Sequence, residues 1–230
     1  MINKTFESIA AALDGIADGS IIMVGGFGTA GMPSKQVDGV IASGARDLTI
    51  ISNNAGNGEI GLAALLKAGR VAKVICSFPR QSDSYVFDEL YRAGKVQLEV
   101  VPQGNLAERI RAAGSGIGAF YSPTGYGTLL AEGKETRVIE GRNYVLEMPL
   151  HADVALIKAE QGDRWGNLTY RKAARNFGPI MAMAATTAIA QVNRIVELGE
   201  LDPEHIITPG IFVQRVVQVP SARSPIANVN

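Results

Sequence analysis

Apolar runs and amphipathic segments alternate through the first 120 residues of this 230-residue chain. Four short apolar runs are typical of buried strands in a parallel sheet: 21–24, 48–52, 71–77 and 96–101. Four other segments place apolar residues at the spacing of one helix face: 6–13, 59–69, 82–91 and 105–114. This alternation predicts an α/β fold with a doubly wound, mostly parallel sheet and right-handed crossovers.

The second half of the chain is less regular. Residues 118–130 are rich in turn formers, and DRWGN (163–167) predicts a tight turn between strands. Residues 152–157 and 186–192 are further strand candidates. Because no repeat, linker or charge run marks a boundary, we expect a single domain over 1–218. Residues 219–230 lack apolar periodicity and are expected to form a C-terminal arm, either ordered or disordered.

Composition narrows the class of protein. Lys plus Arg and Asp plus Glu each total 22, so the chain lacks the basic surplus of a nucleic-acid-binding protein. No apolar run approaches the roughly 20 residues that span a bilayer, and the N-terminus has no apolar signal core. The single Cys76 excludes an intrachain disulfide. We expect a soluble cytoplasmic protein that binds neither nucleic acid nor membrane.

The stretch VGGFGTAGMP (24–33) contains a GxGxxG pattern. A dinucleotide site needs a helix that begins within this motif and an acid about 20 residues later. Pro33 predicts a later helix start, and Ser52-Asn53-Asn54 occupies the place of the acid. A nicotinamide-dependent oxidoreductase therefore becomes an alternative, as does a non-catalytic sensor that binds sugar phosphates. The bare glycine backbone after a strand still predicts a ligand site there.

Several longer motifs resemble the A (α) subunits of the family I 3-oxoacid CoA-transferases. The resemblance runs to about residue 216 and is strongest in five segments: Asp18 to Pro33 with Gly25-Gly26-Phe27, 52–56, 102–104, 120–128 and 171–177. It implies a single CoA-transferase-like domain. It also implies that a CoA thioester is a substrate, with no tightly bound cofactor.

In the family this chain resembles, a glutamate attacks an acyl-CoA to form a mixed anhydride and a free CoA thiolate. The thiolate then attacks the glutamyl carbonyl, and the glutamyl-CoA thioester passes CoA to a second acid in a ping-pong reaction. The family's glutamate lies in a Glu-Asn-Gly-type turn, and this sequence contains no Glu-Asn dipeptide. The resemblance therefore implies no nucleophile on this chain. It implies a B (β) CoA-transferase subunit that supplies the glutamate, in a heterodimer or an A2B2 hetero-oligomer.

The resemblance also assigns supporting roles on this chain. Gln103, Asn53 and Asn54 are expected to line the reacting centre, with Gln103 as the main donor to the oxyanion. The glycine loop is expected to contact the CoA thioester through Gly25, Gly26, Phe27, Gly28, Thr29, Ala30 and Gly31. Two widely separated histidines and one cysteine give no metal-ligand spacing, so no metal is expected.

The acceptor acid is expected to be 3-oxoadipate, with succinyl-CoA as donor, in the β-ketoadipate pathway of aromatic-compound degradation. Residues 78–105 resemble the 3-oxoadipate members of the family, and Arg80 stands in a stretch where acetoacetate-type members carry a glutamate. An arginine can pair with a distal carboxylate that a glutamate would repel. An acetoacetate- or acetate-type transferase is the alternative. Arg171, Lys172 and Arg175 could meet a CoA phosphate, a partner's carboxylate or solvent.

Overall fold

A computed structural model describes residues 2–220 and contains a central sheet of nine strands. Its strand order is β1-β12-β11-β9-β2-β3-β4-β5, with β10 paired to β9. All neighbours along this path are parallel, and β10 is antiparallel to β9. The strands are β1 (Thr5–Phe6), β2 (Ile21–Val24), β3 (Leu48–Asn54), β4 (Val71–Phe78), β5 (Gln97–Val100), β9 (Ala152–Asp163), β10 (Leu168–Thr169), β11 (Ala185–Val196) and β12 (Arg215–Gln218).

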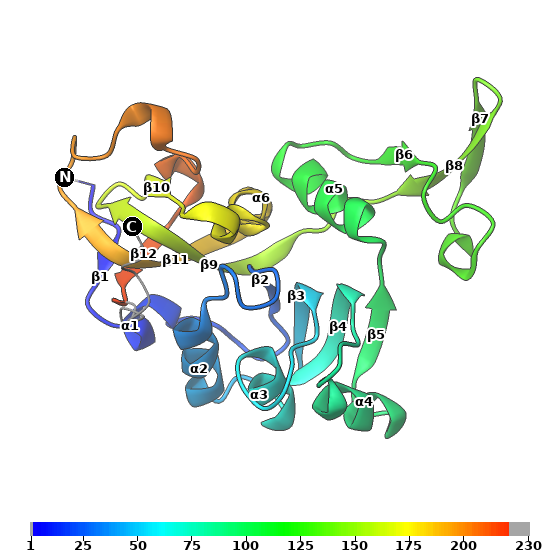
Figure 1. Cartoon of the computed structure of the whole chain (residues 1–230), viewed down its shortest axis with the longest axis horizontal. Helices are drawn as coiled ribbons and strands as arrows, with labels where there is room; N and C mark the ends of the chain where they lie inside the picture. The colour runs from blue at the N-terminus through cyan, green and yellow to red at the C-terminus, as the bar shows by residue number, and fades with distance from the viewer. Residues whose placement is uncertain (1, 221–230) are drawn as a thin grey trace, which may run out of the picture.

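Helices cover both faces of this sheet (Figure 1). Below it in that view lie α2 (Ser34–Ser43), α3 (Leu62–Lys67) and α4 (Tyr85–Arg92); above it lie α5 (Gln103–Gly114) and α6 (Gly178–Ala184). The remaining helical elements are α1 (Ile9–Leu13) and the short 3-10 turns η1 (Leu129–Ala131), η2 (Lys172–Arg175), η3 (Pro203–His205) and η4 (Gly210–Phe212). The predicted doubly wound α/β fold is therefore confirmed.

Strand periodicity divides the hydrophobic core into two clusters. Successive side chains of a strand point to opposite faces, so Ile22 and Val24 join the core beneath α2 and α3, whereas Met23 joins the core beneath α5 and α6. Ile50 and Ile51 of β3 separate in the same way. Because the sheet is buried on both faces, its central strands read as continuous apolar runs in the sequence.

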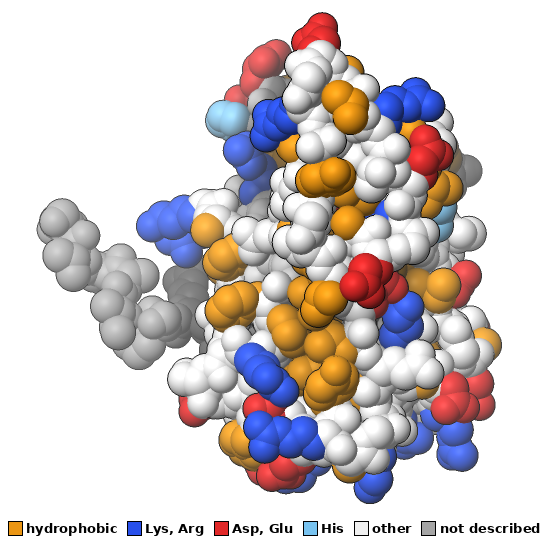
Figure 2. All heavy atoms as spheres, turned by 90° about the vertical axis from the view of Figure 1, so that its right-hand side faces the viewer, with side chains coloured by type: hydrophobic (Ala, Val, Ile, Leu, Met, Phe, Trp, Pro, Cys, Tyr) orange, Lys and Arg blue, Asp and Glu red, His pale blue; other side chains and the backbone are white. Residues whose placement is uncertain are grey.

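A second, antiparallel sheet was not predicted from the sequence. It has the order β6-β8-β7 and consists of β6 (Phe120–Ser122), β7 (Thr136–Ile139) and β8 (Arg142–Glu147). All four residues of β7 are exposed, so no apolar alternation marks this strand. This sheet stands away from the body in Figure 1, and Figure 2 shows hydrophobic side chains among charged ones on that side of the molecule. Asn105 of α5 joins it to the body by accepting a hydrogen bond from Ser122 at 2.8 Å.

Several element ends differ from the sequence prediction. The helix expected over 59–69 begins at Leu62, so Glu59 lies before it and not in its first turn. The helix expected over 82–91 begins at Tyr85, and Ser84 occupies the position before its first residue. The predicted turn at 163–167 is confirmed, since the Asp163 carboxylate accepts hydrogen bonds from the Trp165 and Asn167 amides at 2.9 and 3.1 Å.

The predicted boundary between domain and arm stays a prediction. Val219, at the start of that expected arm, donates its amide to the Val192 carbonyl at 2.8 Å. Residues 221–230 lie outside the part of the chain that the structure describes. Within residues 2–220, no helix has the length and apolar character needed to cross a membrane.

Candidate active site

The glycine loop is a small hairpin at the carboxyl end of β2. The Phe27 amide donates to the Ala30 carbonyl at 2.9 Å, and the Ala30 amide donates to the Phe27 carbonyl at 3.1 Å. Gly28, at the tip, has φ +60°, a backbone conformation that residues with a Cβ rarely adopt. The following helix α2 begins only at Ser34, so its N-terminus does not lie within the GxGxxG motif as a dinucleotide site requires.

Gly31 has a packing role that the sequence did not reveal. A Cβ built on Gly31 would lie 2.6 Å from the Ala174 carbonyl oxygen, closer than any tolerated contact. On the same side, the Asn176 side chain donates from Nδ2 to the Ala30 carbonyl at 3.0 Å. The glycine loop is thus held backbone to backbone against residues 171–176. Gly31 is required for this close approach, whatever ligand the loop contacts.

The loop tip allows a cleaner test of ligand contact than Gly31 does. A Cβ at Gly28 would meet no atom of the described chain within 4 Å. We expect Gly28→Val to lower kcat/KM by between about tenfold and about 100-fold, because a branched side chain would displace a bound thioester. The control for backbone strain is Gly28→Asn, because asparagine tolerates a positive φ better than valine does. Equal kcat/KM values for Gly28→Val and the parent, at equal thermal stability, would contradict a ligand contact at the tip.

Two predicted site residues meet in a cavity at the carboxyl ends of β2 to β5. Its volume is about 350 Å³, and we call it the amide cavity; its lining residues are Phe27, Asn53, Ser77, Phe78, Gln81 and Gln103. Gln103 donates from Nε2 to Asn53 Oδ1 at 2.6 Å. Asn53 is the sixth residue of β3, and Gln103 is the first residue of α5. The topology of the sheet therefore brings together two amides that are 50 residues apart in the chain.

Ser77, which the sequence did not single out, fixes the orientation of Asn53. Its hydroxyl donates to Asn53 Oδ1 at 3.0 Å and approaches the Asn53 carbonyl at 3.1 Å. Since Oδ1 already accepts from Gln103 and Ser77, Nδ2 is the end of this amide that can donate to a ligand. Asn53 is only 4% exposed, so its orientation is set by these two neighbours. The only sequence signal was the position of Ser77 at the end of a predicted strand.

Asn54 belongs to a different cavity. Because side chains alternate along β3, Asn54 points away from Asn53, and its Oδ1 accepts the Gly56 amide at 2.9 Å. Asn54 lines a neighbouring cavity of about 350 Å³ together with Gly28 and Thr29 of the glycine loop. The three amides predicted to line one centre are therefore divided between two cavities. The tip of the glycine loop lies on the Asn54 side, and Phe27 lies on the Asn53 side.

The amide cavity can donate hydrogen bonds but offers no ionisable group among its lining residues. Phe27 and Phe78 at its rim are 53% and 56% exposed, so part of its apolar wall faces outward. Cys76 lies in β4 next to Ser77 but is fully buried, and burial raises the pKa of its thiol to about 12. A thiol in this state is not a nucleophile at neutral pH. The cavity can stabilise a developing oxyanion, and covalent catalysis there needs a group from elsewhere.

Three glutamates of this chain that lie outside regular helices and strands are in other environments. Glu59 is paired with Lys67 at 2.7 Å, and the hydrogen bond from Lys67 is the main cause of its lowered carboxyl pKa. Glu132 follows η1 in a turn, and Glu140 has φ +50° in the two-residue turn between β7 and β8. None of the three lines the amide cavity.

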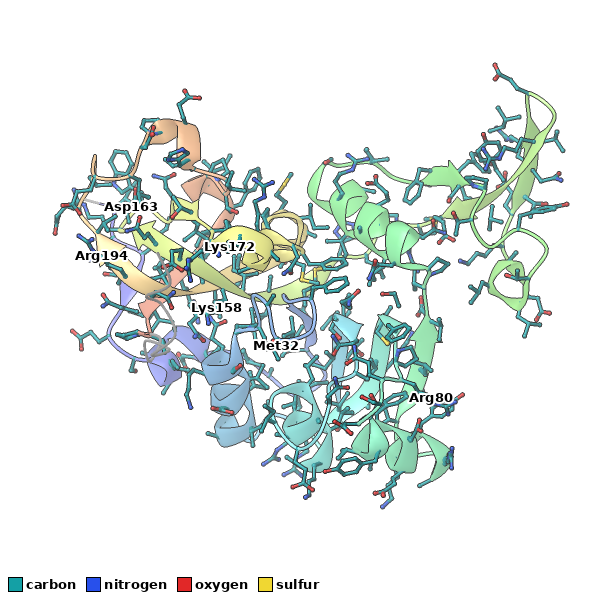
Figure 3. The ribbon with its side chains drawn as sticks, viewed as in Figure 1. Met32, Arg80, Lys158, Asp163, Lys172 and Arg194 are labelled. Atoms are coloured by element: carbon teal, nitrogen blue, oxygen red, sulfur yellow. The ribbon has the colours of Figure 1, made fainter. Side chains whose placement is uncertain are left out.

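Arg80 does not line the amide cavity, although its neighbour Gln81 does. Its Nε donates to the Asp88 carboxylate at 2.5 Å, and its side chain is 55% exposed. Figure 3 shows Arg80 at the β5 edge of the sheet, beside α4. A role in acid selectivity would therefore require the arginine to exchange Asp88 for a substrate carboxylate.

The histidines lie away from this cavity. His151 is exposed, and His205 lies 3.4 Å from Asp202 with 77% of its side chain exposed. In the described range 2–220, no group of three or more His, Cys, Asp or Glu residues is placed to hold a metal ion.

Comparison with known proteins assigns the chain to a family. The coenzyme A transferase family model matches residues 6–219, so this chain belongs to that family. The chain is 86% identical to the A subunit of the 3-oxoadipate CoA-transferase of Pseudomonas putida, over 96% of both chains. It is 66% identical to the protein of the same description from Acinetobacter baylyi, over 96% of this chain and 97% of the relative. It is 50% identical to the A subunit of a succinyl-CoA:3-ketoacid coenzyme A transferase of Xanthomonas campestris, over 93% and 88%.

Solved structures share the fold at lower identity. An acyl-CoA transferase of Escherichia coli O157:H7 superposes with a TM-score of 0.83 at 20% identity, over 99% of this chain and 49% of the other. Glutaconate coenzyme A-transferase of Acidaminococcus fermentans gives 0.81 at 22%, over 94% and 76%. The decarboxylase AibA/AibB gives 0.80 at 26%, over 95% and 84%. Because this fold also occurs in a decarboxylase, the reaction has to be argued from the site and the sequence relatives.

Proposed function

We propose that this chain is the A (α) subunit of a CoA-transferase that moves CoA from succinyl-CoA to 3-oxoadipate, giving 3-oxoadipyl-CoA and succinate. The observation that carries the proposal is the 86% identity to the corresponding subunit of a 3-oxoadipate CoA-transferase over nearly the whole of both chains. Relatives described as acting on 3-ketoacids are 50% identical or less among those compared, which favours 3-oxoadipate over the acetoacetate-type alternative.

In this proposal the nucleophile is a glutamate of the B (β) subunit. It attacks the thioester carbonyl of succinyl-CoA, and the CoA thiolate leaves. The thiolate then attacks the glutamyl carbonyl and releases succinate, which leaves a glutamyl-CoA thioester. A carboxylate of 3-oxoadipate attacks that thioester, and the thiolate that leaves attacks the new anhydride to give 3-oxoadipyl-CoA and free glutamate. No proton has to be gained or lost in the overall exchange.

This chain supplies hydrogen-bond donors to these steps. Each attack places negative charge on a carbonyl oxygen, and a neutral amide can stabilise that charge without protonating the attacking carboxylate. Ser77 and Gln103 hold Asn53 Oδ1, and Asn53 lines the amide cavity, so Nδ2 of Asn53 carries the main donor role in this proposal. Gln103 retains a second Nε2 hydrogen and acts beside it. This differs from the expectation from the sequence, in which Gln103 was the main donor.

The partner is proposed to cover the open side of the amide cavity. The exposed rings of Phe27 and Phe78 lie at its rim and present apolar surface that a second polypeptide could bury. The relatives are themselves described as one lettered subunit of a transferase, which supports the existence of such a partner. Intact mass measurement of the co-purified complex distinguishes a heterodimer from an A2B2 assembly.

The test of the function is a comparison of acceptor acids with the assembled complex. We expect transfer from succinyl-CoA to 3-oxoadipate with a kcat/KM well above that for acetoacetate or acetate. Thioester formation is followed by absorbance, and the product is identified by mass. A preference for acetoacetate would replace the proposed acceptor with the 3-ketoacid alternative. NAD binding without CoA binding, measured by equilibrium dialysis, would overturn the transferase assignment itself.

The selectivity role of Arg80 is tested by Arg80→Met. If Arg80 pairs with the distal carboxylate of 3-oxoadipate, this variant should lose about tenfold in kcat/KM for 3-oxoadipate and little for acetoacetate, because only the first acid carries that charge. The matched control is Arg92→Met, which removes the other arginine near Asp88, 4.0 Å from its carboxylate. Equal losses on both acids, or equal effects of both variants, would refute a role in selectivity.

A further inference from the structure

Residues 171–176 carry a group of cations that the proposed reaction has not used. Arg171, Lys172 and Arg175 are all exposed, and no carboxylate of the described chain forms a salt bridge with any of them. In contrast, many other exposed cations are paired, as Lys67 is with Glu59 at 2.7 Å. Three positive charges without carboxylate partners within five residues repel one another, so a bound anion would lower the electrostatic energy of this segment.

The segment is also held in a defined position. Asn176 fixes it by donating from Nδ2 to both the Ala30 and Ala173 carbonyls, at 3.0 and 2.6 Å. Lys172 has φ +51°, an unfavourable backbone conformation for a residue with a Cβ. Strain of this kind persists where the surrounding structure imposes it, and it is concentrated at binding sites. The contact of Gly31 with Ala174 joins this segment directly to the glycine loop.

Lys172 and Arg175 form one side of an open groove of about 810 Å³. Three carboxylates lie along the other side, Glu200, Asp202 and Glu204. Glu200 lies 3.7 Å from Arg194, and Asp202 lies 3.4 Å from the His205 imidazole. The groove is therefore not positively charged as a whole; Lys172 and Arg175 themselves lie on the side that packs against the glycine loop and have no carboxylate partner there among the described residues.

The cations and Arg80 lie on different sides of the glycine loop. Figure 3 shows Lys172 over the β9 side of the sheet and Arg80 at the β5 edge, with Met32 between them in this view. Met32 directly follows Gly31, and the amide cavity lies on the Arg80 side of the loop through Phe27 and Gln81. A thioester bound at the loop could thus extend its acyl group toward the amide cavity and the rest of its CoA chain toward residues 171–176.

We propose that Arg171, Lys172 and Arg175 bind the phosphate groups at the nucleotide end of the CoA thioester. This inference rests on the proposed transferase function. CoA carries its thiol at one end and a pyrophosphate with a ribose phosphate at the other, and arginine and lysine are the side chains that bind phosphate oxygens. Because the chain as a whole has no net charge, a local cluster is needed to attract this anion. The fixed contact between residues 171–176 and the glycine loop would set the distance between phosphate and thioester.

The test uses the complex with the partner subunit, together with two thioesters of the same acid: succinyl-CoA and S-succinyl pantetheine, which lacks the nucleotide. We expect the double variant Arg171→Gln/Arg175→Gln to lower kcat/KM for succinyl-CoA by at least about tenfold. Its kcat/KM for succinyl pantetheine should be unchanged. Calorimetric titration with free CoA should show the same loss of affinity, and the difference between parent and variant should shrink as salt is added.

The matched control is Arg46→Gln, which removes an exposed arginine at the opposite, amino-terminal edge of the strands. It should leave both thioesters unaffected. Equal losses on the two thioesters, or unchanged CoA affinity in the double variant, would overturn the phosphate site. Weakened association with the partner in sedimentation experiments, with an unchanged ratio of the two kcat/KM values, would instead assign the cluster to a carboxylate of that partner. If the double variant fails to fold, the single variant Arg175→Gln carries the same comparison.

These outcomes are separate from those that test the proposed acceptor. The CoA titration does not involve an acceptor acid, so the phosphate site could hold for a transferase that prefers acetoacetate. Conversely, transfer to 3-oxoadipate with full CoA affinity in the double variant would retain the function and reject the site.

Discussion

Purified alone, this chain is expected to transfer no CoA from succinyl-CoA to any acid, and addition of the partner subunit should restore turnover. The amide cavity offers three side-chain amides, a hydroxyl and two aromatic rings, but no carboxylate among its lining residues. Without a nucleophile the covalent route is closed, and the loss should reach at least about 10⁴-fold in kcat, as for removal of a covalent nucleophile in other enzymes. The measurement is initial rate against the concentration of added partner, at a fixed concentration of this chain.

The location of the nucleophile can be read directly. Incubation of the complex with succinyl-CoA, followed by borohydride or hydroxylamine, should modify a glutamate of the partner, found by peptide mass mapping. Glu59→Gln serves as the control on this chain, because Glu59 is already committed to Lys67 and its loss should leave activity intact. A label on Glu59 or on any other residue of this chain would show that the nucleophile does not belong to the partner subunit. Full activity of the chain alone would show the same.

Removal of the donor amide is expected to have the second largest effect. Asn53→Ala in the assembled complex should lower kcat by between about 100-fold and about 1000-fold, the range found when one oxyanion donor is removed. Asn53→Asp should be at least as severe, because it keeps the shape of the side chain but places a negative charge beside the developing oxyanion. Gln103→Ala should lower kcat less than Asn53→Ala does, because it leaves the main donor in place and removes only a second donor and one of the hydrogen bonds that orient Asn53.

Substitutions of Ser77 test whether this residue positions Asn53 for catalysis or only stabilises the fold. Ser77→Ala should lower kcat by about tenfold with little change in KM, because Asn53 would lose one of the two hydrogen bonds that orient it. Ser77→Thr keeps the hydroxyl and should recover part of that loss. Gln97→Ala, at an exposed amide of β5 outside the cavity, is the control. If Asn53→Ala and Gln97→Ala gave the same kcat at equal thermal stability, the donor role of Asn53 would be excluded.

Local sequence was sufficient for the fold class and for bringing the residues of the candidate site to one edge of the sheet. The apolar runs of β2, β3 and β4 are bounded by glycines and polar residues. A continuous apolar run of this length indicates a strand that is buried on both faces of a sheet. The carboxyl ends of parallel strands meet at one edge, so the glycine loop and Asn53 could be placed together before any contact was known. The missing Glu-Asn turn was also visible in the sequence, and it led to the expectation of a partner.

Features that depend on contacts between distant segments could not be obtained in this way. The small sheet β6-β8-β7 has an exposed outer strand, so the alternation that reveals a strand is absent from β7. The start of α3 moved to Leu62 because Gly61, with φ +55°, lies in a conformation that a helix does not contain. Neither feature changes the residues of the amide cavity.

The sequence by itself determined the α/β fold, the coenzyme A transferase resemblance and the residue types at the sheet edge. Only the tertiary structure decided which of these residues act together: Asn53 with Ser77 and Gln103, Asn54 in the neighbouring cavity, and Gly31 against Ala174. The physical reason is that residue type and periodicity are local properties, whereas a hydrogen bond between residues 53 and 103 or a backbone contact between residues 31 and 174 exists only once the sheet has formed.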